Sequence, residues 1–240
     1  FLHFEGVKSA SYVWINGKEV GYNQGGMEPA EYDITEYLTG GENKIAVKVL
    51  RYSDGTYLEC QDMWRLSGIY RDVYLTATPG VHIRDFYVTT DLDSEYKDAT
   101  LNLKANIKNY TENEINNHKI KLSLYDDENQ NIFAQTVAKD IDFISSKDEI
   151  EISISQIVEN PDKWSAEYPN LYTLTLELYN ENEELLEVLK NRIGFREIEI
   201  KNQAIYVNGV PVKFNGVNSH MQHPETGRMV DEATMRKDLT

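Results

Sequence analysis

The sequence predicts a mostly β fold: a partial jelly-roll-type sandwich, then an immunoglobulin-like β-sandwich, then the first βα unit of a (β/α)8 barrel. Three observations support this order. Residues 1–79 contain short β-branched and aromatic runs separated by tight turns. Residues 80–196 contain longer runs in which apolar and polar residues alternate, with turn residues between them. Residues 197–240 change to short strands, a polar loop and a helical pattern.

The first 79 residues begin with the pattern of a β-hairpin. The runs 11–15 and 18–22 are separated by Asn16-Gly17, and Asn-Gly between two apolar runs is a strong signal for a two-residue hairpin turn. We interpret the segment 29–38 as a strand plus a turn rather than a short helix. The run 44–50 then alternates with a period of two. Many short antiparallel strands indicate a sandwich of jelly-roll type.

Pro79-Gly80 marks a domain boundary, after which strand follows strand. The runs with strand alternation are 81–88, 100–107, 119–126, 149–154, 171–179 and 185–190. About seven strands at this spacing indicate an immunoglobulin-like sandwich, whose charged outward positions form a solvated face rather than a site. The aromatic loop at 164–172 is expected to anchor the last strands.

The pattern changes again after residue 197. The runs 198–200 and 204–207, with a turn at Asn208-Gly209, predict a hairpin, and 211–218 predicts a buried strand. A polar loop at 219–227 leads to a helix for which Asp231 is a suitable N-cap. In a (β/α)8 barrel such a loop lies at the face where active sites are built. One βα unit cannot close a barrel, so we expect this tail to be pinned to the sandwich or poorly ordered.

Composition excludes several classes of protein. The formal net charge is −16 and no basic stripe is present, which argues against a nucleic-acid-binding protein. The single cysteine, Cys60, excludes an internal disulfide framework. No apolar run is long enough to span a membrane. No signal peptide is visible at the start of the chain, and localisation stays open between cytoplasm and periplasm.

The least generic stretch is 51–73. Its central loop combines aromatic and apolar side chains with charged ones: Tyr57, Met63 and Trp64 with Glu59, Asp62 and Arg65. Rigid aromatic rings and carboxylate acceptors suit a polyhydroxylated ligand. The same residues also fit a loop folded onto a small core of its own, with Arg65 paired to a carboxylate, and composition alone favours this second interpretation.

The loop sequence resembles the sugar-binding domain of the β-galactosidases of glycoside hydrolase family 2, in which a very similar SDGS-YLE-QDMWR-SGI-RDV string occurs. Other motifs of the family occur in the family's order and extend the resemblance over essentially all 240 residues. They are VWINGKEVGYNQGGMEPAEYDITEYL and GENKIAVKVLRYSDG upstream, and WSAEYPNLYTL, IGFRE and NGVPVKFNGVNSHMQHPETG downstream. Five motifs in order make the resemblance specific.

The resemblance implies that the chain is a fragment, since family members are several hundred residues longer. Residues 1–79 would be the C-terminal part of the sugar-binding jelly-roll domain, 80–196 the immunoglobulin-like sandwich, and 197–240 the beginning of the TIM-barrel catalytic domain. The missing start of the first domain would leave a strand edge exposed.

The resemblance also implies an activity. The full-length protein would be a retaining glycoside hydrolase that removes terminal non-reducing β-D-galactose residues, with one glutamate as nucleophile and another as acid and then base. Both glutamates are expected beyond Thr240, so the fragment is expected to be inactive. Na⁺ and Mg²⁺ are the expected cofactors of the full-length enzyme, and no cofactor is expected for the fragment.

By the same resemblance, Asp62 and His223 are the main site residues. Asp62 stands at the QDMW aspartate, which hydrogen-bonds a galactose hydroxyl and helps to hold a sodium ion, two roles that suit a carboxylate. His223 stands before the proline of the GVN-x-H-x-x-HP loop and would contact sugar hydroxyls and stabilise the transition state, with His220 as a nearby supporting residue. Ser219 and Met221 replace an arginine and a glutamate that are frequent in the family. The two histidines alone are a weak case for a metal site.

Two other functions stay open. A non-catalytic carbohydrate-binding tandem β-sandwich accounts for residues 1–196, although not for the βα unit with its histidines. Another family 2 activity, β-glucuronidase or β-mannosidase, would use the same scaffold, but the QDMW and HP motifs favour galactosidase. The expected partners are a galactoside and the remainder of the same polypeptide, with no nucleic acid and no membrane, and a homo-oligomer is a possible state of the full-length protein.

Overall fold

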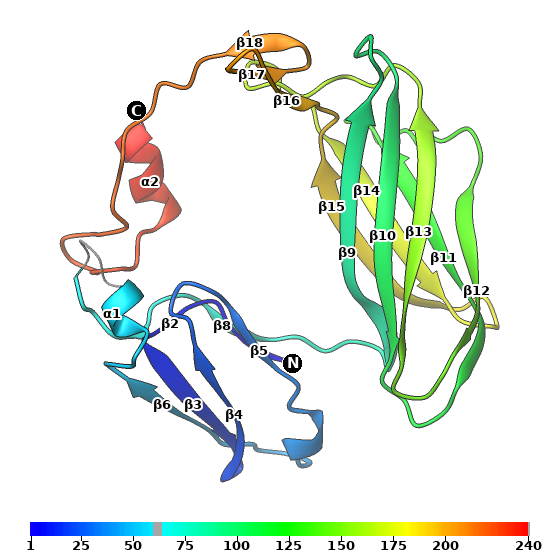
Figure 1. Cartoon of the computed structure of the whole chain (residues 1–240). Helices are drawn as coiled ribbons and strands as arrows, with labels where there is room; N and C mark the ends of the chain where they lie inside the picture. The colour runs from blue at the N-terminus through cyan, green and yellow to red at the C-terminus, as the bar shows by residue number, and fades with distance from the viewer. Residues whose placement is uncertain (60–63, 240) are drawn as a thin grey trace. The chain divides into compact units, whose positions relative to one another are not determined.

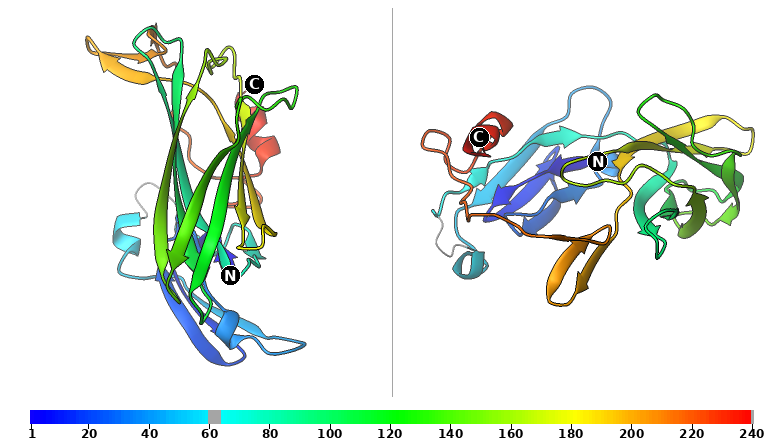
Figure 2. Two further views of the ribbon diagram at one scale, coloured as in Figure 1. Left: turned by 90° about the vertical axis from the view of Figure 1, so that its right-hand side faces the viewer. Right: turned by 90° about the horizontal axis from the view of Figure 1, so that it is seen from above.

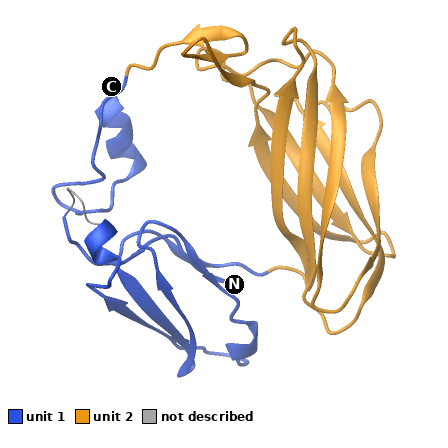
Figure 3. Ribbon diagram, viewed as in Figure 1, with its two compact units in different colours: residues 1–77, 216–240 blue, residues 78–215 orange. Residues whose placement is uncertain are grey.

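The computed structural model describes residues 1–59 and 64–239. The chain forms two compact units (Figure 3). The first unit combines Phe1–Ala77 with Gly216–Thr240, and the second is Thr78–Asn215. The first unit is thus built from two segments that are distant in the sequence.

Small antiparallel sheets make up the first unit (Figure 1). One has the order β5 (Ala30–Tyr32), β1 (Leu2–Phe4), β8 (Val73–Leu75); another has the order β4 (Lys18–Gln24), β3 (Ala10–Ile15), β6 (Ile45–Leu50); and β2 (Val7–Lys8) pairs with β7 (Gly68–Ile69). The helical elements are the 3-10 turn η1 (Thr35–Tyr37), α1 (Thr56–Glu59) and α2 (Glu232–Leu239). A small core fills the unit and includes Leu2, Phe4, Val13, Ile15 and Ile34.

The hairpin predicted around Asn16-Gly17 is confirmed. Strands β3 and β4 pair antiparallel up to Ile15 and Lys18. The φ angles of Asn16 and Gly17 are 52° and 81°, as a two-residue turn of this hand requires. The segment 29–38 is also a strand plus a turn, since β5 is followed by the single 3-10 turn η1.

The second unit contains the predicted immunoglobulin-like sandwich, whose two antiparallel sheets face each other (Figures 1 and 2). One sheet has the order β13 (Glu149–Val158), β10 (Ala99–Asn109), β9 (Val81–Leu92). The other has the order β12 (Val137–Ile144), β11 (Ile115–Tyr125), β14 (Tyr172–Tyr179), β15 (Leu185–Ile193).

Strict alternation explains why these strands form a sandwich. In β10, β11 and β14 every second side chain is buried in the core between the sheets, as Leu101, Leu122 and Leu176 show. The six predicted runs are all strands. The sequence did not predict β12, because its buried Ile141 and Ile144 are three positions apart and the residues between are exposed, so its pattern lacks the period of two.

A three-stranded meander follows the sandwich within the second unit: β16 (Ile198–Lys201), β17 (Ala204–Val207) and β18 (Val210–Val212). The predicted hairpin and its Asn208-Gly209 turn are present, with φ of 49° and 76°. The Tyr96 hydroxyl donates to Glu199 Oε2 at 2.6 Å, and Lys201 Nζ donates to the Tyr96 hydroxyl oxygen at 3.1 Å. These contacts fix the meander to the 93–98 loop.

The aromatic loop at 164–172 anchors the end of the sandwich, as predicted. The Trp164 amide donates to Phe195 O at 2.8 Å, and the Arg196 guanidinium lies 4.8 Å from the centre of the Trp164 ring. A Cβ on Gly194 would lie 2.9 Å from Trp164 Cβ. The glycine therefore permits the close approach of the tryptophan.

The prediction of a buried strand at 211–218 is wrong. Only Val210–Val212 is in a strand, and residues 213–218 are irregular. Phe214 and Val217 are 75% and 94% exposed. A barrel strand is stabilised by parallel neighbours on both sides, and the described residues provide none for this segment. The predicted helix after Asp231 is present as α2.

Candidate functional site

Asp62 and Cys60 lie outside the described residues, which stop at Glu59 and resume at Trp64. Tyr57 and Trp64 are 81% and 55% exposed. These rings are not buried in a separate core of the loop. This exposure argues against the interpretation of the loop as a self-contained structural element and leaves both rings available to a ligand.

The loop starts from a cluster of hydroxyl groups. Thr56 is buried, and its Oγ1 accepts a hydrogen bond from the Ser53 amide at 2.9 Å. Ser9 Oγ lies 2.9 Å from Thr56 Oγ1 and also hydrogen-bonds the Ser53 hydroxyl. Asp54 accepts from the Gly55 amide at 3.0 Å and from the Gln24 side chain. The Ser-Asp-Gly-Thr sequence thereby closes the turn that begins α1 and ties it to β2–β3 and β4.

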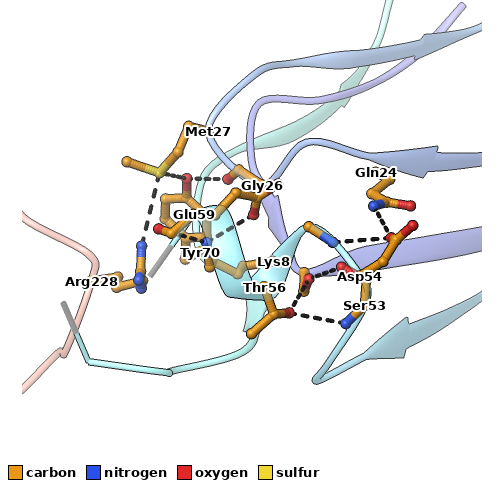
Figure 4. A network of polar contacts seen from close by, with 12 residues as sticks. Lys8, Gln24, Gly26, Met27, Ser53, Asp54, Thr56, Glu59, Tyr70 and Arg228 are labelled. Carbon is orange, nitrogen blue, oxygen red and sulfur yellow. Dashed lines mark hydrogen bonds and ion pairs between the residues drawn. The ribbon is translucent and has the colours of Figure 1, made fainter. Parts of the chain in front are cut away.

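A buried ion pair holds the end of α1 (Figure 4). Lys8 on β2 is only 2% exposed, and its Nζ donates to Glu59 Oε2 at 2.9 Å. The same ammonium lies 3.5 Å from the Glu59 carbonyl oxygen. A buried ammonium requires a charged or hydrogen-bonding partner, so Lys8 fixes both the side chain and the backbone of Glu59.

His223 is built into a tight turn of its own. The backbone amides of His223 and Gly227 pair with each other's carbonyl oxygens at 2.7 and 3.0 Å. His223 Nδ1 accepts from the amides of Glu225 and Thr226 at 3.2 and 3.3 Å. With Nδ1 as acceptor, the neutral ring carries its proton on Nε2. The imidazole therefore presents a donor on the edge that the turn does not use.

The turn ends at Gly227, where both the backbone conformation and the close approach of Leu66 favour glycine. Gly227 has φ of 70°, and an added Cβ would lie 2.9 Å from Leu66 Cδ1. The His223 turn therefore contacts the chain just after Trp64. His220 is exposed, and its carbonyl oxygen accepts from the Gln222 amide at 2.9 Å.

Arg228 joins the His223 turn to the chain at Trp64. Its side chain is buried, and its Nη2 donates to the carbonyl oxygen of Trp64 at 2.8 Å. Its Nη1 lies 3.8 Å from Met27 Sδ, which is also 3.2 Å from the Tyr70 hydroxyl. Tyr70 in turn donates to Gly26 O (Figure 4). Arg228, which follows the His223 turn, is thus linked to the backbone of Trp64.

A large open cleft lies beside these contacts, within the first unit. Its volume is about 1130 Å³. Leu66, Tyr70 and Arg71 line it from one segment, and Glu225, Arg228 and Met235 line it from the other. It has a mixed polar and apolar lining and is large enough for a sugar ligand.

Sequence reasoning did not find Lys8 or Arg228. Neither belongs to a motif with a local signature, and their partners are 51 and 164 positions away in the chain. No group of three or more histidine, cysteine or carboxylate side chains that could hold a metal is present in the described part of the chain. Nor does any helix in that part have the length and apolarity that a membrane crossing requires.

Family models match the chain in three consecutive parts. The sugar-binding domain of glycosyl hydrolases family 2 matches residues 1–79, the family 2 domain that follows it matches 81–196, and the family 2 TIM-barrel domain matches 198–240. The chain belongs to glycosyl hydrolase family 2. The family's order of domains agrees with the predicted mostly β fold and with the resemblance seen in the motifs.

Curated family 2 relatives are similar along nearly the whole chain. A β-galactosidase of Priestia megaterium is 45% identical over 228 residues, which are 95% of this chain and 22% of the relative. A β-galactosidase of Pectobacterium atrosepticum is 43% identical over 98% of this chain and 23% of its own length. The chain therefore spans less than a quarter of the length of these relatives.

Solved family 2 structures have the same fold. β-Glucuronidase 2 of Bacteroides uniformis, covalently bound to cyclophellitol-6-carboxylate aziridine, matches with a TM-score of 0.89 and 26% identity, over 99% of this chain and 29% of that chain. The β-glucuronidase of Parabacteroides merdae matches with a TM-score of 0.80 and 22% identity over 99% of this chain and 30% of that chain. The second likeness concerns the fold alone.

Proposed function

We propose that the protein to which this chain belongs is a retaining glycoside hydrolase that removes terminal non-reducing β-D-galactose residues. The observation that carries this proposal is the identity of 41–45% to four β-galactosidases over 95–100% of the chain. The glucuronidase structures share the fold at lower identity. β-Glucuronidase activity is therefore the second candidate.

In this proposal Asp62 and His223 bind the sugar. Asp62 accepts a hydrogen bond from a galactose hydroxyl, as a carboxylate does readily. His223 donates from Nε2 to another hydroxyl, because its Nδ1 already accepts the Glu225 and Thr226 amides. A donor that strengthens its hydrogen bond as charge develops on the sugar lowers the barrier. His220 supports this loop.

The two catalytic glutamates are proposed to lie elsewhere in the full-length enzyme. In a retaining mechanism they flank the scissile bond, and one forms a covalent glycosyl intermediate while the other transfers the proton. The sugar-binding residues of this chain would orient the galactose between them. Na⁺ or Mg²⁺ would need further oxygen ligands in addition to the Asp62 carboxylate.

Hydrolysis of nitrophenyl glycosides by the full-length protein tests the proposal. We expect turnover of the β-galactoside and little turnover of the β-glucuronide or β-mannoside. Asp62→Ala and His223→Ala are each expected to lower kcat/KM by about a hundredfold, the effect typical of lost transition-state hydrogen bonds. The isolated chain of 240 residues is expected to be inactive.

His223 also supports its own turn, so its variant requires a control. His223→Asn keeps a side-chain acceptor for the backbone amides but removes the imidazole donor. If His223→Asn were as active as the wild type, the imidazole would have no role in the reaction. Preferred hydrolysis of the glucuronide would contradict the galactosidase proposal and select the second candidate. Turnover by the isolated chain would contradict the placement of the glutamates.

A further inference from the structure

Asn-Gly occurs three times in the sequence, and the structure holds the three asparagines differently. The pairs are Asn16-Gly17, Asn208-Gly209 and Asn215-Gly216. Asparagine followed by glycine is a reactive context for spontaneous deamidation, because glycine has no Cβ to hinder its own amide nitrogen. The reaction also requires the asparagine side chain to turn back onto that nitrogen. Its rate therefore depends on how firmly the folded protein holds each asparagine.

Asn16 is exposed, but its side-chain amide is engaged in hydrogen bonds. Its Nδ2 donates to Tyr37 O at 3.0 Å and to Asn43 Oδ1 at 2.7 Å. Its Oδ1 accepts from the Lys44 amide at 2.9 Å. The pair also forms the turn of the hairpin between β3 and β4. Deamidation of Asn16 therefore requires three side-chain hydrogen bonds to break first.

Asn208 is half-buried, and its side chain is held in a similar way. Its Oδ1 accepts from the Glu197 amide at 2.9 Å, and its Nδ2 donates to Trp164 O at 3.1 Å. The Tyr96 ring lies against the following glycine, so that a Cβ on Gly209 would be 2.6 Å from Tyr96 Cε2. Both the asparagine side chain and the glycine are therefore restrained.

Asn215 differs from both, since it is exposed and lies in the irregular stretch 213–218. Its side chain makes no hydrogen bond to any other residue that the structure describes. A Cβ on Gly216 would meet no atom within 4 Å apart from those of its chain neighbours. Phe214 and Val217 are 75% and 94% exposed, so the flanking residues are not anchored in a core. The side chain of Asn215 is thus free to turn onto the Gly216 nitrogen.

We infer that Asn215-Gly216 is a site of spontaneous modification in this chain, and that the fold protects Asn16 and Asn208 from the same reaction. The Gly216 nitrogen loses its proton and attacks the side-chain carbonyl carbon, Cγ, of Asn215. The N–Cγ bond forms, the Cγ–Nδ2 bond breaks, and ammonia leaves with the proton. Water then opens the cyclic imide at either carbonyl, which gives aspartate or isoaspartate. Water is the only co-reactant.

The modification falls at the junction of the two units. Asn215 ends the second unit, and Gly216 begins the last segment of the first. Each event adds a negative charge to a chain whose formal net charge is already −16, and isoaspartate also lengthens the backbone at this point. Neither product alters a residue of the two hydrophobic clusters. Modified chains are therefore expected to stay folded and to accumulate as a charge variant.

Peptide mass spectrometry of the chain, after incubation in mildly alkaline buffer, tests the inference. Fragmentation assigns each conversion of an amide to a carboxyl group to one asparagine, and chromatography separates aspartate from isoaspartate. We expect conversion at Asn215, with rates at Asn16 and Asn208 lower by at least about tenfold, because their hydrogen bonds must break first. The same chain unfolded in urea is the reference. There all three pairs are unrestrained, and their rates should converge.

Two variants test the cause. Gly216→Ala places a methyl group beside the attacking nitrogen, and the open space around Gly216 accommodates it, so conversion of Asn215 should slow severalfold. Asn43→Ala removes one acceptor of Asn16 Nδ2, so conversion of Asn16 should accelerate while that of Asn215 is unchanged. Two results would overturn the inference. One is conversion of Asn16 or Asn208 in the folded chain as fast as that of Asn215, and the other is conversion of Asn215 in urea but not in the folded chain.

Discussion

Lys8 shows how one buried charge constrains its surroundings. Lys8 is the last residue of the two-residue strand β2, at a buried position where an apolar side chain would be usual. Its ammonium is paired with the carboxylate of Glu59, whose side chain is 23% exposed. The two partners are therefore not equivalent. Without Lys8 the carboxylate of Glu59 can still be solvated, whereas without Glu59 the ammonium of Lys8 stays buried.

This asymmetry gives a prediction about Glu59. We expect Glu59→Gln to lower the free energy of unfolding of the first unit by about 3 kcal/mol, the low end for a broken buried pair, because Glu59 is partly exposed. Lys8→Met should cost less, since an apolar side chain of similar length can replace a buried cation. Urea unfolding of the chain measures both.

Lys104→Met is the reference variant for this comparison. It breaks the pair with Glu151, in which both side chains are more than half exposed, so it should change stability by less than about 1 kcal/mol. An equal loss for Glu59→Gln and Lys8→Met would show that the Lys8 ammonium gains its stabilisation from groups other than Glu59.

At the scale of elements, α2 depends on Asp231, the residue directly before its first turn. Asp231 Oδ1 accepts from the Thr234 amide at 2.8 Å. Hydrogen bonds from the Thr234 side chain and backbone hold the pKa of Asp231 below its ordinary value of 3.8, and His223 contributes in the same direction. The ionised carboxylate also complements the positive end of the helix.

The pH dependence of α2 follows from this shift. Because the folded pKa is lower than the unfolded one, the stabilising contribution is complete above 3.8 and is lost as pH falls through the lower folded value. Asp231→Asn keeps a capping acceptor but cannot titrate. Carbon chemical shifts of residues 232–239 should show the wild-type helix weakening in acid, while Asp231→Asn shows no such transition. An identical acid response in both would exclude Asp231 as its cause.

Local sequence patterns predicted the elements whose conformation is set by neighbouring residues. They did not predict correctly the elements whose conformation depends on residues far away in the sequence. The Asn16-Gly17 hairpin and the alternation around Leu122 are properties of neighbouring positions, and both were predicted. Strand β12 was not predicted. It lies at the edge of its sheet, and its only buried residues are Ile141 and Ile144, near its end, so its sequence does not alternate with a period of two. Residues 213–218 of the expected strand have no strand-pairing partners among the described residues, and a local pattern cannot reveal this.

The candidate site was predictable only in part for the same reason. His223 and Asp62 were found by resemblance to a family, whereas the tight turn from His223 to Gly227 was not predicted beyond a polar loop at 219–227. The roles of Lys8 and Arg228 depend on partners far away in the chain. No short sequence window contains both members of either contact.

At the scale of the whole chain, the two hydrophobic clusters have no residue in common. Leu122 is 1% exposed and belongs to the core of the second unit. Leu122→Ala should lower the stability of that unit by about 2–5 kcal/mol, since it leaves a cavity between the sheets. Hydrogen exchange in urea, followed for peptides of each unit, should show earlier opening of 78–215 and an unchanged first unit.

The reciprocal substitution is Val13→Ala in the core of the first unit. It should accelerate exchange in the peptides of residues 1–77 and leave the sandwich peptides unchanged. A single transition, in which either substitution destabilises all peptides equally, would show that the two units unfold as one cooperative body.

The first unit is assembled from both ends of the sequence, and this has a consequence for biosynthesis. Arg228 cannot meet Trp64 until the ribosome has made the 164 positions that separate them. Closing so long a flexible loop is entropically unfavourable, but the sandwich occupies most of this stretch as a folded body, so that much less of it is flexible chain. The second unit is thus expected to fold during translation before the contact between Arg228 and Trp64 can form.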